Sequence, residues 1–260
     1  MKSWLLLLSF LFFAPNLLSV HLISIPAKPV KKELFDKVMA EKIKSMDDLE
    51  RYIDSLQADH GIKFESVQYA NLVSDAVRNR FYHCYSYYSL KENWIAALCG
   101  KFIWQDLSAI VIPNDILKYS MGACSQQCIV LMELFRRKRI DFRKVSFDHH
   151  FAMEAKLNDS WVYFDPDMEP PYINGTRSGL NYLLQSNHLE ELYKNIIPAN
   201  TVKIMLGHPH EGKINEYPAR KAKFFHVITN FLSHWLWIIP LFIFLLPLHK
   251  RFTYKLNSII

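Results

Sequence analysis

Apolar residues recur at helical spacing in the first half of the chain, which predicts a series of helices. Two such stripes lie within residues 33–58. Ser45, which an acidic residue follows three positions later, is typical of a capping box that starts the second helix. A further helix is expected at about 67–83. Residues 124–139 are apolar nearly all round through Phe135, so we expect a buried central helix there.

After residue 140 the pattern changes to short runs rich in aromatic and β-branched residues, FRKVSF, HHFAMEAKL and SWVYFD, which are typical of strands. Asn158-Asp159 is the expected turn between the last two. A helix is predicted at 187–195 and a final strand at 201–206, whereas the aromatic-rich stretch 84–122 receives no assignment. Helices that precede an antiparallel sheet indicate an α+β fold.

Both ends of the chain are strongly apolar. Residues 1–25 begin with a lysine and an apolar run, the pattern of a signal peptide or an uncleaved signal anchor. Residues 231–249 contain no charged residue, and 224–249 are long enough for a transmembrane helix. A basic linker, 207–223, precedes this segment, and residues 250–260 would form a short cytoplasmic tail.

The basic flanks on both sides of the C-terminal apolar segment leave its orientation undecided. The N-terminal signal decides it: the middle of the chain should be extracytoplasmic and the protein a single-pass membrane protein. Thirty-one Lys and Arg against 25 Asp and Glu give a net charge of +6. The only dense basic run, RRKR at 136–139, is explained as a solvated helix end, so no nucleic-acid partner is predicted.

Cys124 follows Gly122-Ala123 and should lie in the first turn of the central helix. Unpaired backbone N–H groups and the helix dipole favour a thiolate there, and they can also donate to an oxyanion. A cysteine nucleophile needs a base nearby, and the base needs an orienting partner.

The predicted hairpin can supply both groups. A turn at Asn158-Asp159 pairs Ala152 with Asp165, and residues two apart share a face of a strand. His150 and Asp165 are therefore expected on one face, with Ala152, Glu154 and Asp167, while His149 points the other way. A slip of one residue would reverse this assignment.

With these motifs the chain resembles the transglutaminase-like superfamily of papain-fold proteins over roughly residues 80–170. The similar stretches are G-x-C at 122–124, I-D-F-R-K-V at 140–145, H-x-x-x-E at 150–154 and W-V-Y-F-D-P at 161–166. The resemblance implies a papain-like core, with a central helix packed on an antiparallel sheet, over residues 84–206. Residues 30–83 would form a helical N-terminal region.

The resemblance also implies a catalytic triad of Cys124, His150 and Asp165. Two departures mark a divergent branch: Arg139 and Asp141 replace the family's usual Gly and Pro before the first strand, and Phe151-Ala152 replaces its aromatic pattern after the His. The sequence does not identify the substrate.

Several alternatives stay open. Asp167 is the main rival of Asp165, and Trp94 and Gln126 are candidates for a second oxyanion donor. Zinc at Cys124, Cys128 and His150 is a weak alternative without a supporting C-x-x-C pair, and no cofactor or metal is predicted. By default Cys84, Cys99 and Cys128 are core residues, although Cys84 and Cys99 would be able to form a disulfide in an exported protein.

The sequence thus predicts a membrane-tethered extracytoplasmic cysteine enzyme that acts on an amide or peptide bond, with a protein or peptide as its substrate. Hydrolysis is favoured over amine transfer because the domain is small and has no obvious calcium site. The alternative is a non-catalytic transglutaminase-like module that binds or assembles within an envelope complex.

Cys124 should be the only highly reactive thiol of the four, because it alone begins a helix beside a candidate base. We expect iodoacetamide, followed by peptide mass spectrometry across a pH series, to modify Cys124 well before the other three. Equal labelling of Cys84 or Cys128 would contradict the assignment.

Overall fold

The computed structural model describes residues 3–24, 34–168, 170, 177–185 and 188–246. The chain divides into two compact units. The helical unit comprises Met1–Ile25, Tyr87–Ile110 and Lys221–Ile260, and the α+β unit comprises Pro26–Ser86 and Val111–Arg220. The fold is therefore mixed α and β, as the sequence predicts. The predicted cytoplasmic tail, 250–260, lies outside the described residues.

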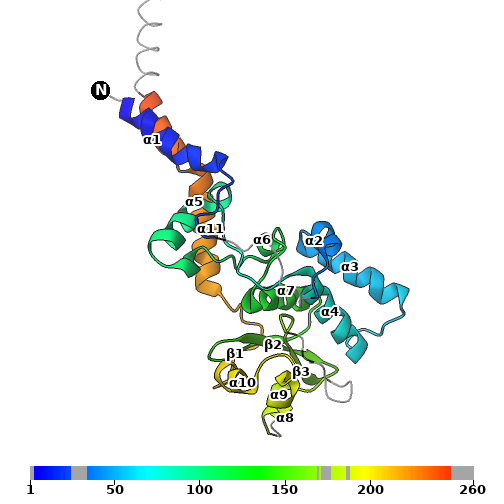
Figure 1. Cartoon of the computed structure of the whole chain (residues 1–260). Coiled ribbons are helices and arrows are strands. Elements are labelled where there is room, and N and C mark those ends of the chain that lie inside the picture. Colours follow the sequence, from blue (N-terminus) through cyan, green and yellow to red (C-terminus); the bar gives the residue numbers. More distant parts are fainter. Residues whose placement is uncertain (1–2, 25–33, 169, 171–176, 186–187, 247–260) are drawn as a thin grey trace, which may run out of the picture. The chain divides into compact units, whose positions relative to one another are not determined.

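A four-stranded antiparallel sheet forms the centre of the α+β unit (Figure 1). Its order is β3-β2-β1-β4, with β1 at Phe142–Ser146, β2 at Phe151–Leu157, β3 at Ser160–Phe164 and β4 at His210–Glu211. The first three strands are those expected from the sequence. Part of the predicted basic linker contributes β4, which pairs with the end of β1.

The β2–β3 hairpin has the predicted turn and register. Leu157 pairs with Ser160 and Met153 with Phe164. Asn158 and Asp159 both adopt left-handed φ values, 45° and 63°, which a two-residue turn matched to strand twist requires. Extending this register by one pair sets Ala152 opposite Asp165, so His150 and Asp165 share a face as expected.

Helix α7, Cys124–Arg137, covers one face of the sheet (Figure 1) and is the predicted central helix. The Phe135 and Phe164 rings meet with their centroids 5.3 Å apart. Arg139, between α7 and β1, adopts a left-handed φ of 59°. A side chain is strained in this conformation, which Gly adopts freely.

The N-terminal helices of this unit are α2 at Lys37–Lys42, α3 at Met46–Asp59 and α4 at Val67–Arg80. Side chains that accept a first-turn N–H cap all three. The predicted cap of α3 is confirmed, since the Ser45 hydroxyl accepts from the Asp48 N–H at 3.1 Å. Each capped start is worth about 1 kcal/mol and fixes where the helix begins.

Three short helices cover the other face of the sheet: α8 at Leu180–Gln185, α9 at His188–Tyr193 and α10 at Ala199–Met205 (Figure 1). The helix expected at 187–195 is present. The strand expected at 201–206 is wrong, because that run is α10. Val202 and Leu206, one helical turn apart, are buried in the core, while Ile204 is 63% exposed. A short apolar run does not distinguish a strand from a helix.

The helical unit contains α1 at Ser3–Phe13, η1 at Ala14–Leu17, α5 at Leu90–Phe102, η2 at Gln105–Leu107 and α11 at Arg220–Trp235. The short α6, Pro113–Ile116, belongs to the α+β unit. No single helix among the described residues has both the length and the apolar composition to cross a membrane. Helices α11 and Ile238–Leu246, which meet at a bend of 40°, meet that criterion only as a pair.

Substitutions in α10 distinguish a helix from a strand. In a helix Leu206 faces the core and Ile204 does not, so Leu206→Ala should lower the free energy of unfolding by about 2–4 kcal/mol. Ile204→Ala should change it by less than about 0.5 kcal/mol. Chemical denaturation would measure both; equal losses would indicate a strand, in which residues two apart share a face.

Candidate active site

Cys124 is the first residue of α7, with Ala123 as the extended N-cap residue (φ −70°, ψ 167°). Gly122, two residues before it, makes two hydrogen bonds. Its N–H donates to the Tyr82 carbonyl at 3.0 Å, and its carbonyl accepts from the Gln127 side-chain amide at 2.8 Å. A side chain at Gly122 would approach the Phe81 ring to 3.2 Å. The G-x-C motif thus fits a close approach that precedes a helix N-terminus.

His150 and Asp165 form a buried hydrogen-bonded pair. His150 immediately precedes β2 and Asp165 immediately follows β3, so both lie just beyond the paired ends of the hairpin. The His150 Nε2 atom lies 2.7 Å from Asp165 Oδ2, with 2% and 0% of the two side chains exposed. The structure therefore brings these two predicted residues together, while their catalytic role stays a prediction.

Asp165 has two further donors that sequence reasoning missed. The Tyr193 hydroxyl of α9 donates to Oδ2, and the Met168 backbone N–H donates to Oδ1 at 3.2 Å. Tyr163 of β3 bonds in turn to the Tyr193 hydroxyl at 2.9 Å. No local signal points to Tyr193, which is far from the hairpin in sequence and outside residues 80–170, where the sequence motifs lie.

These contacts set the charges of the pair. Burial alone opposes protonation of His150, but the Asp165 charge and hydrogen bond, together with an interaction with Cys124, raise the pKa of His150 to about 11. Burial also opposes ionisation of Asp165, yet His150, Tyr193 and the Met168 N–H lower the pKa of its carboxyl. The arrangement favours an imidazolium beside a carboxylate.

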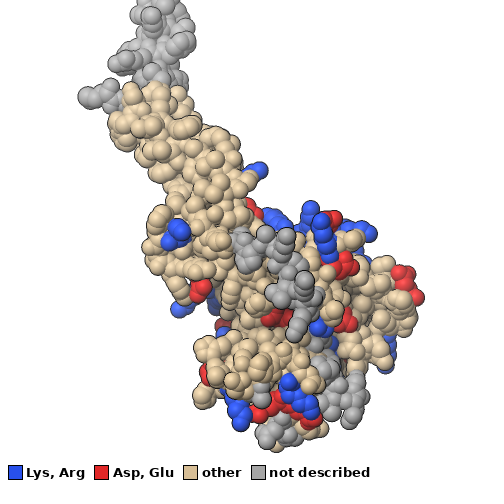
Figure 2. All heavy atoms as spheres, viewed as in Figure 1, with Lys and Arg blue, Asp and Glu red and all other residues tan. Residues whose placement is uncertain are grey.

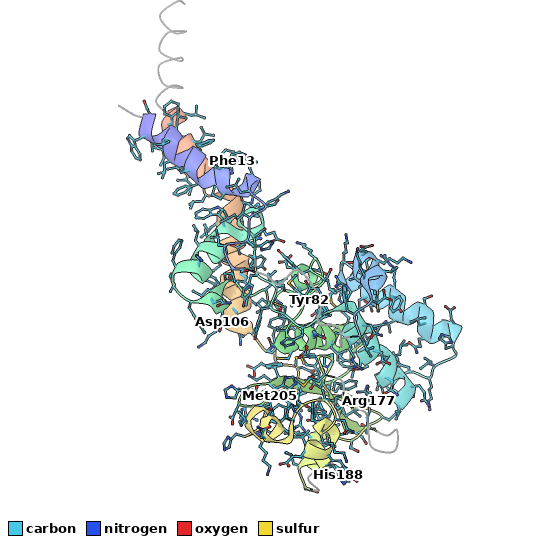
Figure 3. The ribbon with its side chains drawn as sticks, viewed as in Figure 1. Phe13, Tyr82, Asp106, Arg177, His188 and Met205 are labelled. Carbon is cyan, nitrogen blue, oxygen red and sulfur yellow. The ribbon has the colours of Figure 1, made fainter. Side chains whose placement is uncertain are left out.

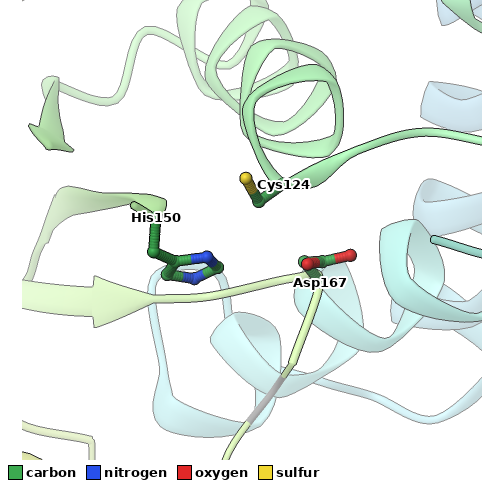
Figure 4. Close-up of side chains that lie close together, drawn as sticks. All are labelled: Cys124, His150 and Asp167. Atoms are coloured by element: carbon green, nitrogen blue, oxygen red, sulfur yellow. The ribbon is translucent and has the colours of Figure 1, made fainter. Parts of the chain in front are cut away.

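Cys124 Sγ, a His150 ring nitrogen and an Asp167 carboxylate oxygen lie within 4.8 Å of one another (Figure 4). Because His150 Nε2 bonds Asp165, Nδ1 is the nitrogen left to face the sulfur. The same three residue types are able to ligate a metal ion, so this group is the candidate metal site of the described residues. It differs from the zinc alternative, since Cys128 Sγ instead contacts the Phe151 carbonyl at 3.4 Å.

Asp167, the rival of Asp165, has other partners. Its side chain is 2% exposed and bonds His83 Nδ1 at 2.8 Å, and the Gln127 amide donates to it at 2.8 Å. Asp167 lies beside Cys124 (Figure 4), but the hydrogen-bond partner of His150 is Asp165. His83 is a second residue that the sequence did not indicate, because it lies outside every motif and far before the first one, at 122–124.

His149 is exposed, and its backbone N–H donates to the Met205 carbonyl at 3.3 Å. Of the two adjacent histidines only His150 therefore enters the cluster. None of the four cysteines is in a disulfide, so the possible Cys84–Cys99 disulfide is not formed. Cys128 is buried as expected, whereas Cys84 and Cys99 are partly exposed.

Both side chains proposed as second oxyanion donors have other roles. The Gln126 amide donates to the Ser86 carbonyl at 3.0 Å, while its oxygen accepts from the Ser86 and Ala123 N–H groups. The Trp94 indole donates to the Ser233 carbonyl at 2.9 Å. Beside Cys124, the first-turn N–H groups of α7 lack helical partners, so they are available as hydrogen-bond donors.

The Glu of the H-x-x-x-E motif is structural. Glu154 is fully buried, accepts from Arg143 Nε of the neighbouring strand at 2.7 Å and accepts from the Leu180 N–H at 2.7 Å. It joins β1, β2 and the start of α8, and so it fixes the strands that carry His150.

Comparison of the chain with family models, curated proteins and solved structures gives no match. The Cys-His-Asp group is compatible with a papain-like fold and with the site of a cysteine hydrolase.

The buried pair predicts a pH-dependent stability. With a pKa raised to about 11, His150 contributes fully below its ordinary pKa of about 6.5, and the contribution is lost as the pH rises through the raised value. Asp165, with a lowered pKa, contributes above about pH 3.9 and loses its contribution as the pH falls through the lowered value. His150→Gln should cost about 3 kcal/mol at about pH 5.5 and progressively less toward high pH.

Chemical denaturation of the full chain, from about pH 5.5 upward, would measure the difference in unfolding free energy between the wild type and His150→Gln. His149→Gln is the matched control, because His149 is exposed and its substitution should change stability little at any pH. A His150→Gln effect that does not vary with pH would show that the pair is not ionised.

Proposed function

We propose that the protein is a membrane-tethered, extracytoplasmic cysteine enzyme that cleaves an amide or peptide bond. One observation carries the proposal: Cys124 at a helix N-terminus faces a buried His150 that Asp165 holds through a 2.7 Å hydrogen bond. These are the three parts that nucleophilic catalysis by cysteine requires.

In the proposed reaction the Cys124 thiolate attacks the carbonyl carbon, and the oxyanion accepts N–H groups of the first turn of α7. His150, protonated by the thiol, gives its proton to the amine as the C–N bond breaks, which leaves a thioester on Cys124. Water then attacks the thioester with His150 as the base and releases the acid. Asp165 keeps the imidazole oriented throughout.

The buried acid–base pair supports an enzyme over a non-catalytic module, because an unused buried His–Asp pair is costly to keep. The membrane tether and the extracytoplasmic location rest on the apolar ends and the signal-like start of the chain. The resemblance to transglutaminase-like proteins allows either water or an amine as the acceptor. Hydrolysis remains our choice for this small domain.

The alkylation rate of Cys124 tests the proposal without a known substrate. His150→Ala should abolish the enhanced reactivity of Cys124 near neutral pH, because the thiolate loses its imidazolium partner. His149→Ala, on the adjacent exposed residue, should leave it largely intact. Asp165→Asn should fall between them, and Asp167→Asn should have a smaller effect. Iodoacetamide rates measured against pH would show this order, and far-UV circular dichroism would check the folding of each variant.

Turnover distinguishes hydrolysis from amine transfer. Incubation with a peptide library and a fluorescent primary amine should give hydrolysed peptides, detected by mass spectrometry, that Cys124→Ser does not produce. Amine adducts instead would indicate transfer. If Cys124 reacts no faster than a model thiol in the wild type, the protein is a non-catalytic module and the proposal fails.

A further inference from the structure

The helical unit has its polar side chains on the inside. Asn93 is fully buried in α5 and bonds two α11 hydroxyls, accepting from Ser233 Oγ at 3.1 Å and donating to Thr229 Oγ1 at 2.9 Å. His226, also on α11 and fully buried, bonds the Leu107 carbonyl at 3.0 Å. Polar side chains that hold helices together from within are typical of helices packed in lipid.

The apolar N-terminal segment is built into this unit. Ser9 Oγ of α1 donates to the Trp237 carbonyl at 2.8 Å, and Asn16 Nδ2 donates to the Ser233 carbonyl at 3.0 Å. The Phe13 ring, labelled in Figure 3, meets the Trp237 ring edge-on at 5.4 Å. From Ser9 in α1 to Asn16 in η1, the partner residue moves back from Trp237 to Ser233. The two segments are therefore antiparallel.

The outer surface of the same helices is apolar. Large hydrophobic side chains are exposed along α1, along α11 and along the helix Ile238–Leu246. In Figure 2 the upper part of these helices is almost free of charged residues, and the exposed Lys and Arg residues of α11, Arg220, Lys221 and Lys223, lie in its first turn. The most exposed members are Trp4, Leu7, Phe10, Phe224, Phe231 and Phe242. An apolar surface of this extent marks a membrane or protein interaction site, and polar groups on the inside favour a membrane.

We infer that the acyl chains of a lipid bilayer cover this surface, and that α1 is a permanent membrane helix rather than a signal peptide that is removed. The inference deepens the membrane tether of the proposed function and rests on it. Removal of residues 1–25 would take away the partners of Trp237 and Ser233 and expose the inner side of the C-terminal helices. Because α1 and the C-terminal helices are antiparallel, the start of α1 and the end of the helix Ile238–Leu246 lie on the same side of the membrane.

Epitope tags at the two ends of the full chain test both parts of the inference. The intact protein should carry both tags at its full mass, and protease added to sealed vesicles should remove both tags or neither. Loss of the N-terminal tag by cleavage would overturn the inference, and so would tags on opposite sides of the membrane.

A charge-scanning comparison tests the lipid contact. Phe10 and Phe231 are 61% and 63% exposed. Ile204 of α10, in the other unit, is equally exposed at 63% and serves as the matched control. The double variant Phe10→Glu/Phe231→Glu should lower the fraction that resists alkaline extraction from membranes by roughly tenfold or more, since a carboxylate in hydrocarbon is strongly disfavoured. Ile204→Glu should leave it unchanged. Equal retention of both variants would show that water, not lipid, covers the helices.

Alkylation of Cys124 in the same samples separates this inference from the proposed function. A wild-type rate in the double variant shows that the α+β unit is folded. An unreactive Cys124 in a membrane-retained protein would defeat the enzyme proposal and leave the membrane arrangement intact.

Discussion

The hydrogen bond between His150 and Asp165 is the interaction on which the site depends. Its atoms are 2.7 Å apart and almost wholly removed from water, so each group would be strongly destabilised without the other. The β2–β3 register brings the two residues to one face, and Tyr193 and the Met168 N–H complete the hydrogen bonding of the carboxylate. Contacts from β2, β3, α9 and the Met168 backbone thus hold this ion pair in place and keep it out of water.

Helix α7 contributes the third group from the other side of the sheet. Its buried apolar face packs on the strands, while its first residue, Cys124, reaches the paired ends of the hairpin where His150 lies. Asp167 adds a second carboxylate beside the sulfur, restrained by His83 and Gln127. The sulfur therefore lies beside one carboxylate and one imidazole, and the imidazole is bonded to Asp165 rather than to Asp167.

The two units differ in which side chains they bury and which they expose. The α+β unit buries apolar side chains around its sheet and admits polar groups only in satisfied clusters, such as Glu154 with Arg143. The helical unit buries Asn93 and its partners and exposes phenylalanine and tryptophan. That contrast is what two different solvents would produce, and it is the physical basis for assigning lipid to the second unit.

The sequence by itself determined the features that depend on local periodicity. Alternation along residues 150–165 and the Asn158-Asp159 turn fixed the hairpin register, because side chains in a strand repeat every two residues. Capping at Ser45 and the apolar run after Cys124 fixed two helix starts. The tertiary structure alone decided the rest. The apolar pattern of residues 201–206 fits a strand and a helix equally well. The run is a helix in the structure, where Val202 and Leu206 are buried together. The hydrogen bond from Tyr193 to Asp165 and the contact of α1 with Trp237 join residues that are distant in sequence. Which of Asp165 and Asp167 bonds His150 depends on where each lies around the site. No local pattern encodes such contacts, since only chain folding sets the partners that are available.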